Sequence, residues 1–316
     1  MEKSPIQSLH HVTATVDDAT QDLDFYRDLL GLRLVKRTVN FDNHHVYHFY
    51  YGDERGMPGT IWTTFPYKGH GVPVGQIGAG QIAVTSFSVP RDSLEFWRDR
   101  LGARGVPVGE PAPTFGEERI AFSDPSGLAM ELIAGDRDAR TPWTGADVPS
   151  DDAIRGLHGV TLLLHRPDAT VRLMTELLGF ERVSETTGRI RLAVNGDEPG
   201  KLVDIVYGTG ARAAMNGLGT VHHVAMAVDG AEAQLTLRER LIDYGLKVTE
   251  VLDRQYFQSI YFREPGGVLF EVATMQPGFT VDEPLTTLGR ELKLPPWEEP
   301  NRDEIERGLP AIPAYV

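Results

Sequence analysis

One pattern occurs four times along this chain and restricts its fold more than any other feature: a short apolar strand, an amphipathic helix, then further strand-like runs. The helices are DLDFYRDLLG, SLEFWRDRLG, TVRLMTELLG and LRERLIDYG, and their terminal glycines lie roughly 70 residues apart, a spacing typical of internal repeats. In the first helix Leu23, Tyr26, Leu29 and Leu30 form one apolar stripe at helical spacing. A glycine just after such a stripe can adopt the left-handed conformation that ends a helix. We therefore expect four copies of one unit, with helix-ending glycines at Gly31, Gly102, Gly179 and Gly245.

Strand-like runs follow each helix, and a turn of proline and glycine joins the last two. These turns are 124–127, 198–200 and 264–267, and the first copy has a looser version between Gly52 and Gly59. Proline presets φ for a turn and glycine accepts positive φ, so each turn predicts a hairpin. The pattern predicts an α+β fold of four βαβββ modules, at about residues 6–66, 78–135, 155–208 and 219–275.

We expect the modules to pair in chain order into two domains. Each domain would form a cup-shaped mixed β-sheet with its helices outside. The predicted boundaries are 1–140 for the N-terminal domain, 141–154 for a polar linker, 155–276 for the C-terminal domain and 277–316 for a proline-rich tail. The tail is expected to carry one short helix near Arg302–Arg307.

Composition excludes several classes of function. The formal net charge is −14 and no basic patch occurs, so neither a nucleic acid nor an anionic membrane is an expected partner. No signal peptide is recognisable, and no apolar run approaches the ~20 residues that cross a bilayer. Cysteine is absent, which excludes disulfides, thiolate metal sites, iron–sulfur clusters and a cysteine nucleophile. We expect a cytoplasmic protein and leave open whether it forms a homo-oligomer.

Histidine doublets occur in the first strands of modules 1 and 4. Alignment of the modules places His10, His158 and His222 in one column, and His11 and His223 in the next, where module 3 has Gly159. Side chains alternate between the faces of a strand, so only one histidine of each doublet is expected to face a shared cup. The second column contains histidine only as a pair, which is the pattern expected of two ligands to one ion.

Glu271 lies within the apolar strand VLFEVAT, where an unpaired carboxylate would be costly. His11, His223 and Glu271 therefore predict a mononuclear metal site. Two imidazoles and one carboxylate leave about three positions open on an octahedral ion, the usual arrangement for non-haem Fe(II). Tetrahedral zinc with one water is the competing assignment. Thr63 replaces the carboxylate that ends the equivalent strand in the other modules, so the site stays open.

The chain resembles the vicinal oxygen chelate superfamily of glyoxalases, bleomycin resistance proteins and extradiol dioxygenases. Within it, the segments LHHVT, GTVHHVAMAV and SIYFREPGGVLFEVAT are similar to the dioxygenases that cleave hydroquinones and chlorohydroquinones. Ligands from the first and last modules carry this resemblance, because Gly159 occupies the ligand column of module 3. The resemblance implies that His10, Thr13, His222, Arg254 and Tyr261 line a substrate pocket and assist catalysis.

We accordingly expect an Fe(II)-dependent ring-cleaving dioxygenase that takes O₂ and a small para-dihydroxylated aromatic substrate, chlorinated ones included. Extradiol cleavage of a catechol is the nearest alternative. Metal-dependent isomerase or lyase chemistry of the glyoxalase type is the second, and it would not require oxygen. A non-catalytic drug-binding module is the third, and the histidine and glutamate ligands argue against it.

Other polar residues are expected to have lesser roles. Glu131 and His158 are interpreted as the remnant of a second site between modules 2 and 3. His44, His45 and His48 have no partner column, so they are expected at the surface or in a pocket wall.

Overall fold

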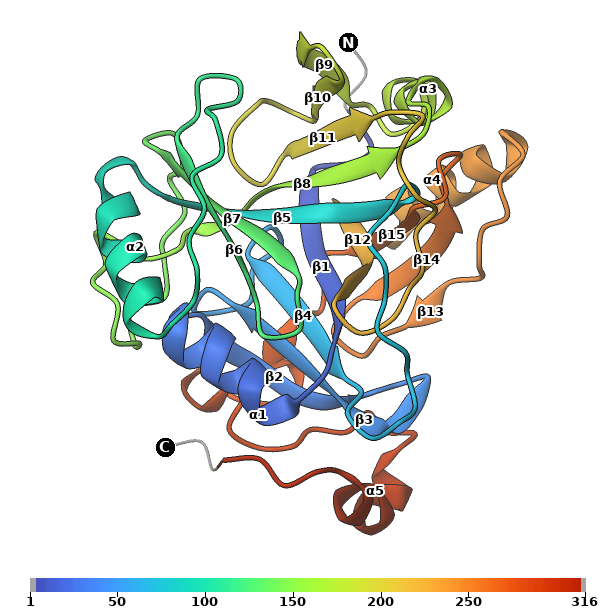
Figure 1. Ribbon diagram of the computed structural model, residues 1–316. Helices are drawn as coiled ribbons and strands as arrows, with labels where there is room; N and C mark the ends of the chain where they lie inside the picture. Colours follow the sequence, from blue (N-terminus) through green and yellow to red (C-terminus); the bar gives the residue numbers. More distant parts are fainter. Residues whose placement is uncertain (1–3, 314–316) are drawn as a thin grey trace.

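The computed structural model describes residues 4–313, which form two curled β-sheets with the helices on the outside (Figure 1). The expected α+β class and the two sheets are confirmed. The eight-stranded sheet has the order β13-β14-β15-β12-β1-β4-β3-β2. Its strands are β1 (Ser8–Val16), β2 (Arg33–Asn40), β3 (Asn43–Gly52), β4 (Ile61–Pro66), β12 (Thr220–Val228), β13 (Leu252–Asp253), β14 (Gln258–Arg263) and β15 (Leu269–Thr274).

The seven-stranded sheet has the order β6-β7-β5-β8-β11-β10-β9. Its strands are β5 (Gln81–Pro90), β6 (Arg119–Ser123), β7 (Ala129–Gly135), β8 (Gly156–Leu164), β9 (Glu181–Thr186), β10 (Arg189–Ala193) and β11 (Leu202–Tyr207). Module 1 thus shares a sheet with module 4, and module 2 with module 3. The expected pairing of modules in chain order is therefore wrong for the sheets, because β1 pairs with β12 and β5 pairs with β8, each antiparallel. The boundaries predicted for two domains along the chain stay a prediction.

The helices are α1 (Ala19–Leu23), α2 (Leu94–Ala103), α3 (Asp168–Glu176), α4 (Ala231–Asp243) and α5 (Arg302–Gly308). The first expected helix continues from α1 into a π-helical turn over Asp24–Leu29. Gly31, Gly179 and Gly245 have positive φ, as expected of residues that end helices. Gly102 differs, because α2 runs through it and the left-handed residue is Gly105. Helix α5 confirms the helix expected in the tail.

The last strand of each module begins after a glycine in a left-handed conformation. Gly59, Gly127, Gly200 and Gly267 have φ between 86° and 101°. This conformation is accessible to glycine at little cost, so these four positions fix the start of β4, β7, β11 and β15. The hairpins predicted from the proline and glycine turns are confirmed for β6–β7, β10–β11 and β14–β15.

A buried carboxyl group holds α1 against the eight-stranded sheet. Asp22 is 3% exposed and accepts hydrogen bonds from the hydroxyls of Tyr51 and Thr64, both at 2.6 Å. Burial raises the pKa of Asp22 to about 8. The folded protein therefore binds a proton here that the unfolded chain releases near its ordinary pKa of 3.8. The associated stability is complete below that value and is lost as the pH rises towards 8.

Asp22→Asn tests this directly, since the amide cannot ionise. Between pH 5 and pH 8 the wild type should lose stability relative to the variant, with a slope approaching ~1.4 kcal/mol per pH unit. Urea unfolding of both proteins across this range measures the difference. Parallel pH profiles would contradict the assignment of a proton to Asp22.

Candidate metal centre

Three adjacent strands at the centre of the eight-stranded sheet bring His11, His223 and Glu271 together. His11 lies on β1, His223 on β12 and Glu271 on β15. The Nε2 atoms of the two histidines are 3.3 Å apart, and Oε2 of Glu271 lies 3.3 Å from His11 Nε2 and 2.9 Å from His223 Nε2. All three side chains are buried. Among residues 4–313 this is the one group of three or more potential ligands within coordination range of a single point.

The two Nε2 atoms and Oε2 of Glu271 are arranged as ligands to a metal rather than as hydrogen-bond partners of one another. Oε2 of Glu271 is fully buried, yet no donor among the described residues meets it with hydrogen-bond geometry, despite the short distances to the imidazoles. Such an orphaned carboxylate oxygen is costly unless a cation compensates it. Burial alone would raise the pKa of Glu271, but His11 and His223 outweigh burial and hold the pKa well below its usual range. Ser259 donates to the other oxygen, Oε1, and orients the carboxylate.

A β-bulge brings the two rings of each histidine doublet into contact. In the β1–β12 ladder His11 pairs with Ala225 and Thr13 with His223, and the register shifts at His10 on one strand and at His222 on the other. An extra residue in one strand breaks the strict alternation of side chains. The expectation that only one histidine of each doublet faces the cup holds for the first doublet, where His11 but not His10 lines the cavity, and is wrong for the second, where both His222 and His223 line it. The Nδ1 atoms are 2.8 Å apart in the first doublet and 2.7 Å apart in the second.

These contacts set the tautomers of the ligands. If Nδ1–H of His11 donates to Nδ1 of His10, Nε2 of His11 keeps its lone pair for a metal. His10 then carries its proton on Nε2 and hydrogen-bonds to the backbone of Thr274. Outer partners of this kind orient metal-binding imidazoles and raise their basicity. Burial, with a smaller contribution from His11, lowers the pKa of His10 to about 3, so this ring is neutral.

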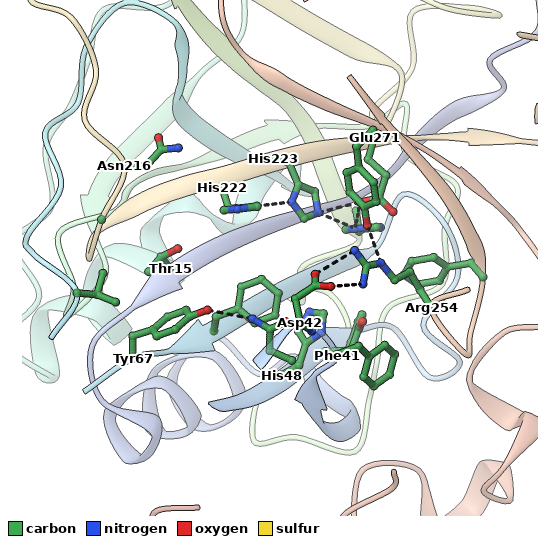
Figure 2. Close-up of a pocket in the computed structure, with 18 residues that line it drawn as sticks. Thr15, Phe41, Asp42, His48, Tyr67, Asn216, His222, His223, Arg254 and Glu271 are labelled. Atoms are coloured by element: carbon green, nitrogen blue, oxygen red, sulfur yellow. Dashed lines mark hydrogen bonds and ion pairs between the residues drawn. The ribbon is translucent and has the colours of Figure 1, made fainter. Parts of the chain in front are cut away.

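A cavity of about 390 Å³ opens directly from these three side chains (Figure 2). This volume falls within the range typical of small-molecule sites. Six phenylalanine and tyrosine rings line it, namely Phe41, Tyr50, Phe65, Tyr67, Phe257 and Tyr261. Polar groups stand among these rings, and beyond the three ligands they include Asn40, Asp42, His48, Asn216, His222 and Arg254. The centre therefore faces a cavity that combines aromatic surfaces with polar groups, a lining that suits a small aromatic molecule with polar substituents.

Arg254 and Tyr261 stand beside the ligands as a pair. Tyr261 lies opposite Glu271 in the β14–β15 ladder, and its hydroxyl accepts a hydrogen bond from Nε of Arg254 at 3.1 Å. Burial, reinforced by the charge of Glu271, raises the pKa of Tyr261 well above its usual range, so the hydroxyl keeps its proton. The guanidinium also pairs with Asp42 at 3.1 and 3.3 Å, as the dashed lines in Figure 2 show.

The residues expected in the pocket wall divide into two groups. His222, Arg254 and Tyr261 line the cavity. His10 and Thr13 do not: His10 packs behind His11 and against Phe257, and Thr13 accepts a hydrogen bond from Thr63. For His10 and Thr13 the expected place in the wall is therefore wrong: His10 lies at the bulge behind His11, and the hydroxyl of Thr13 is engaged by Thr63.

Several wall residues were missed by sequence reasoning. Phe41, Asp42 and Tyr67 come from module 1 and Asn216 from the segment before β12, and none of them belongs to a column shared by the modules. His48 lines the same wall, and the choice between surface and pocket wall is settled for it. His44 instead pairs with Glu298 of the tail at 2.9 Å.

The equivalent place in the seven-stranded sheet is filled by ion pairs. His158 Nε2 lies 3.0 Å from Glu117, and Glu131 pairs with Arg119 at 3.2 Å. A side chain at Gly159 would also be blocked, since a Cβ there would lie 2.8 Å from the carbonyl oxygen of Leu202. The guanidinium of Arg119 thus compensates the charge of Glu131, the carboxylate that would otherwise be free to bind a metal. This agrees with a degenerate second site.

Comparison with known proteins identifies the family. The model of the Glyoxalase/Bleomycin resistance protein/Dioxygenase superfamily matches residues 8–132 and 156–272. The chain belongs to this superfamily. A crystal structure of a "putative dioxygenase" from Bacillus subtilis superposes with a TM-score of 0.93 and 41% identity, covering 100% of this chain and 99% of that one.

Within residues 4–313 no helix combines the length and apolar character that a membrane span requires.

Two curated relatives match over nearly their full length. The "Putative ring-cleaving dioxygenase MhqO" of Bacillus subtilis is 44% identical over 301 residues, covering 95% of each chain. The "Chlorohydroquinone/hydroquinone 1,2-dioxygenase" of Sphingobium indicum is 36% identical over 312 residues, covering 96% of each chain. This member of the superfamily is therefore similar along its whole length to ring-cleaving dioxygenases.

Proposed function

We propose that this protein is a mononuclear Fe(II)-dependent dioxygenase that cleaves the ring of hydroquinone-type aromatics, chlorinated ones included. The observation that carries the proposal is the buried set of His11, His223 and Glu271, open on one side to an aromatic-walled cavity. The relative named for chlorohydroquinone and hydroquinone supports the substrate class. Relatives named as ring-cleaving enzymes support the reaction.

The ligand atoms are Nε2 of His11, Nε2 of His223 and Oε2 of Glu271. Fe(II) held by these two imidazoles and one carboxylate would leave positions for substrate and O₂ and would supply a path for electrons from an electron-rich ring to O₂. Ser259 fixes the carboxylate, and His10 fixes the ring of His11. These supports are buried, so the ligand geometry is set before any substrate enters.

The remaining wall residues bind and orient the substrate. The Tyr261 hydroxyl, held by Arg254, is a neutral donor beside Glu271 and can hydrogen-bond to an oxygen that carries negative charge. The side chain of His222 contacts His223 through Nδ1 and presents the rest of its ring to the cavity. The aromatic wall excludes water from the ring, which strengthens each of these polar contacts.

Oxygen consumption tests the proposal. A catechol can chelate iron through two adjacent oxygens, whereas a hydroquinone can present only one and depends on the pocket wall for its orientation. For Fe(II)-loaded protein we expect kcat/KM for a hydroquinone to exceed that for catechol by at least about tenfold, or roughly 1.4 kcal/mol. The ring-opened product should be identified by mass at matched iron loading.

Three results would contradict parts of this assignment. Preference for catechol would overturn the substrate. Turnover without oxygen would favour isomerase or lyase chemistry of the glyoxalase type. Full activity with zinc and none with iron would overturn the metal.

A further inference from the structure

We propose that His48 is a substrate-binding residue whose Nδ1 atom accepts a hydrogen bond from the hydroxyl group para to the oxygen that faces the metal centre. The inference deepens the proposed function and rests on it. It assigns the residue that distinguishes a dihydroxylated ring from a monophenol.

His48 is held rigidly in the cavity wall. It lies in the middle of β3, opposite Thr38 of β2, and is 8% exposed. Its ring packs between Tyr50 and Phe65, with centroid distances of 4.0 and 4.2 Å. Both neighbours line the same cavity as the three metal ligands. In Figure 2 His48 lies below His222, His223 and Glu271.

A chain of hydroxyl groups determines which nitrogen of His48 carries the proton. Nε2 lies 2.8 Å from Oγ1 of Thr63, and this hydroxyl donates in turn to Oγ1 of Thr13 at 2.9 Å. A hydroxyl has a single proton to donate, so Nε2 of His48 must be the donor to Thr63. The tautomer with the proton on Nε2 leaves a lone pair on Nδ1. Burial holds the pKa of His48 well below its usual range, which keeps the ring neutral.

Nδ1 of His48 is available to a ligand. It makes no hydrogen bond to another described residue, and it is not among the fully buried polar atoms that lack a partner, so it is open to the cavity. Two neighbouring polar side chains are already engaged. Arg254 binds Asp42 and Tyr261, and Asn40 donates to the hydroxyl of Tyr67 at 2.9 Å. A hydroxyl group that enters this part of the cavity therefore meets a preformed acceptor at His48.

Thr63 also explains why this acceptor occurs in module 1. It stands where modules 2, 3 and 4 have a carboxylate, and it pairs with Thr13 in the β1–β4 ladder. A carboxylate at this place would accept from Nε2 and also compete for the metal. The threonine instead fixes the imidazole tautomer and leaves the metal with three protein ligands.

Binding to the Fe(II)-loaded protein without oxygen tests the role of His48 separately from turnover. Hydroquinone and 4-methylphenol have similar shapes, but only hydroquinone has a second hydroxyl group. The wild type should bind hydroquinone about tenfold more tightly, the effect of one well-made hydrogen bond to a buried acceptor. Calorimetry or optical titration gives both dissociation constants, with iron content measured on each sample.

Two substitutions separate the two nitrogens of the ring. His48→Gln can keep the contact to Thr63 but places no acceptor at Nδ1. The ratio of the dissociation constants of 4-methylphenol and hydroquinone should therefore fall to near one, because hydroquinone alone binds more weakly. His48→Asn places an amide oxygen near Nδ1 and should keep a preference of several-fold. An unchanged preference in His48→Gln, an equal weakening of both ligands, a preference near one in the wild type, or loss of iron from both variants would each overturn the proposal.

Oxygen uptake on the same samples separates this inference from the proposed function. If the wild type prefers hydroquinone as described but consumes no oxygen with it, the role of His48 stands and the dioxygenase assignment fails. If oxygen is consumed while His48→Gln leaves the preference unchanged, the dioxygenase assignment stands and the role of His48 fails.

Discussion

Fe(II)-loaded His11→Ala and His223→Ala proteins should each contain less than about a tenth of an iron per chain after gel filtration, whereas the wild type should contain about one. Each substitution removes one of three protein ligands and leaves Glu271 facing a single imidazole. Activity should fall with the iron content. Iron analysis, with circular dichroism to verify the fold, measures the effect.

His158→Ala is the matched control. His158 is a buried histidine on the first strand of module 3, but its partner is Glu117 and it lies in the other sheet. This variant should keep its iron although it loses a side chain of the same kind from an equivalent strand. Retention of full iron by His11→Ala, or equal loss of iron from the control, would contradict the ligand assignment.

His10→Ala should give an intermediate result. His10 does not reach the metal position, but it contacts Nδ1 of His11 at 2.8 Å and fixes the orientation of that ring. Loss of such an outer partner typically weakens metal affinity by roughly 10–100-fold. The graded series of wild type, His10→Ala and His11→Ala therefore separates a ligand from the residue that positions it.

The candidate metal ligands were predictable because the chain repeats. Alignment of the modules placed His11 and His223 in one column and showed Glu271 as a carboxylate within an apolar strand. The structure brings those three side chains together. The contact between the two rings of each doublet was not predictable, since the alternation of strand side chains fails at a bulge and no local signal marks a bulge here. The tautomer of His48 depends on Thr63 and Thr13, which only strand pairing brings near it.

The pairing of modules 1 and 4 was also not visible in any single segment. All four modules carry similar apolar strands, so their patterns permit several arrangements of sheets. The choice depends on contacts between distant strands, such as β1 with β12 and β5 with β8. The placement of ligands in the first and last modules was the one feature of the sequence that required those two modules to meet.

The second large effect concerns a lysine that anchors the tail beside the metal centre. Lys36 on β2 is fully buried, and its ammonium group contacts Asp282 at 2.7 Å and Glu283 at 2.8 Å. Asp282 in turn accepts from the hydroxyl of Tyr256 at 3.1 Å. The next residue, Phe257, packs against the ring of His11 with a centroid distance of 5.2 Å. The ion pairs thus connect the tail to the back of the ligand set.

Lys36→Met keeps the length of the side chain but removes the charge. Because Glu283 is also buried, its carboxylate would be left without its cation, and removal of one partner from a buried ion pair typically costs about 3–5 kcal/mol. Urea unfolding of the metal-loaded proteins should show a loss of that order. Lys293→Met is the control, because Lys293 pairs with a largely exposed Glu291 and should change stability by less than about 1 kcal/mol.

A combined variant separates the uncompensated charge from the lost contacts. In Lys36→Met/Asp282→Asn/Glu283→Gln no carboxylate remains beside the removed ammonium group, so most of the lost stability should return. If Lys36→Met unfolds like Lys293→Met, the ion pairs do not anchor the tail. If the combined variant is as unstable as Lys36→Met, packing rather than charge holds the tail against β2. Recovery in the combined variant, with iron content equal to that of the wild type, would show that the instability of Lys36→Met comes from the carboxylates left without their cation.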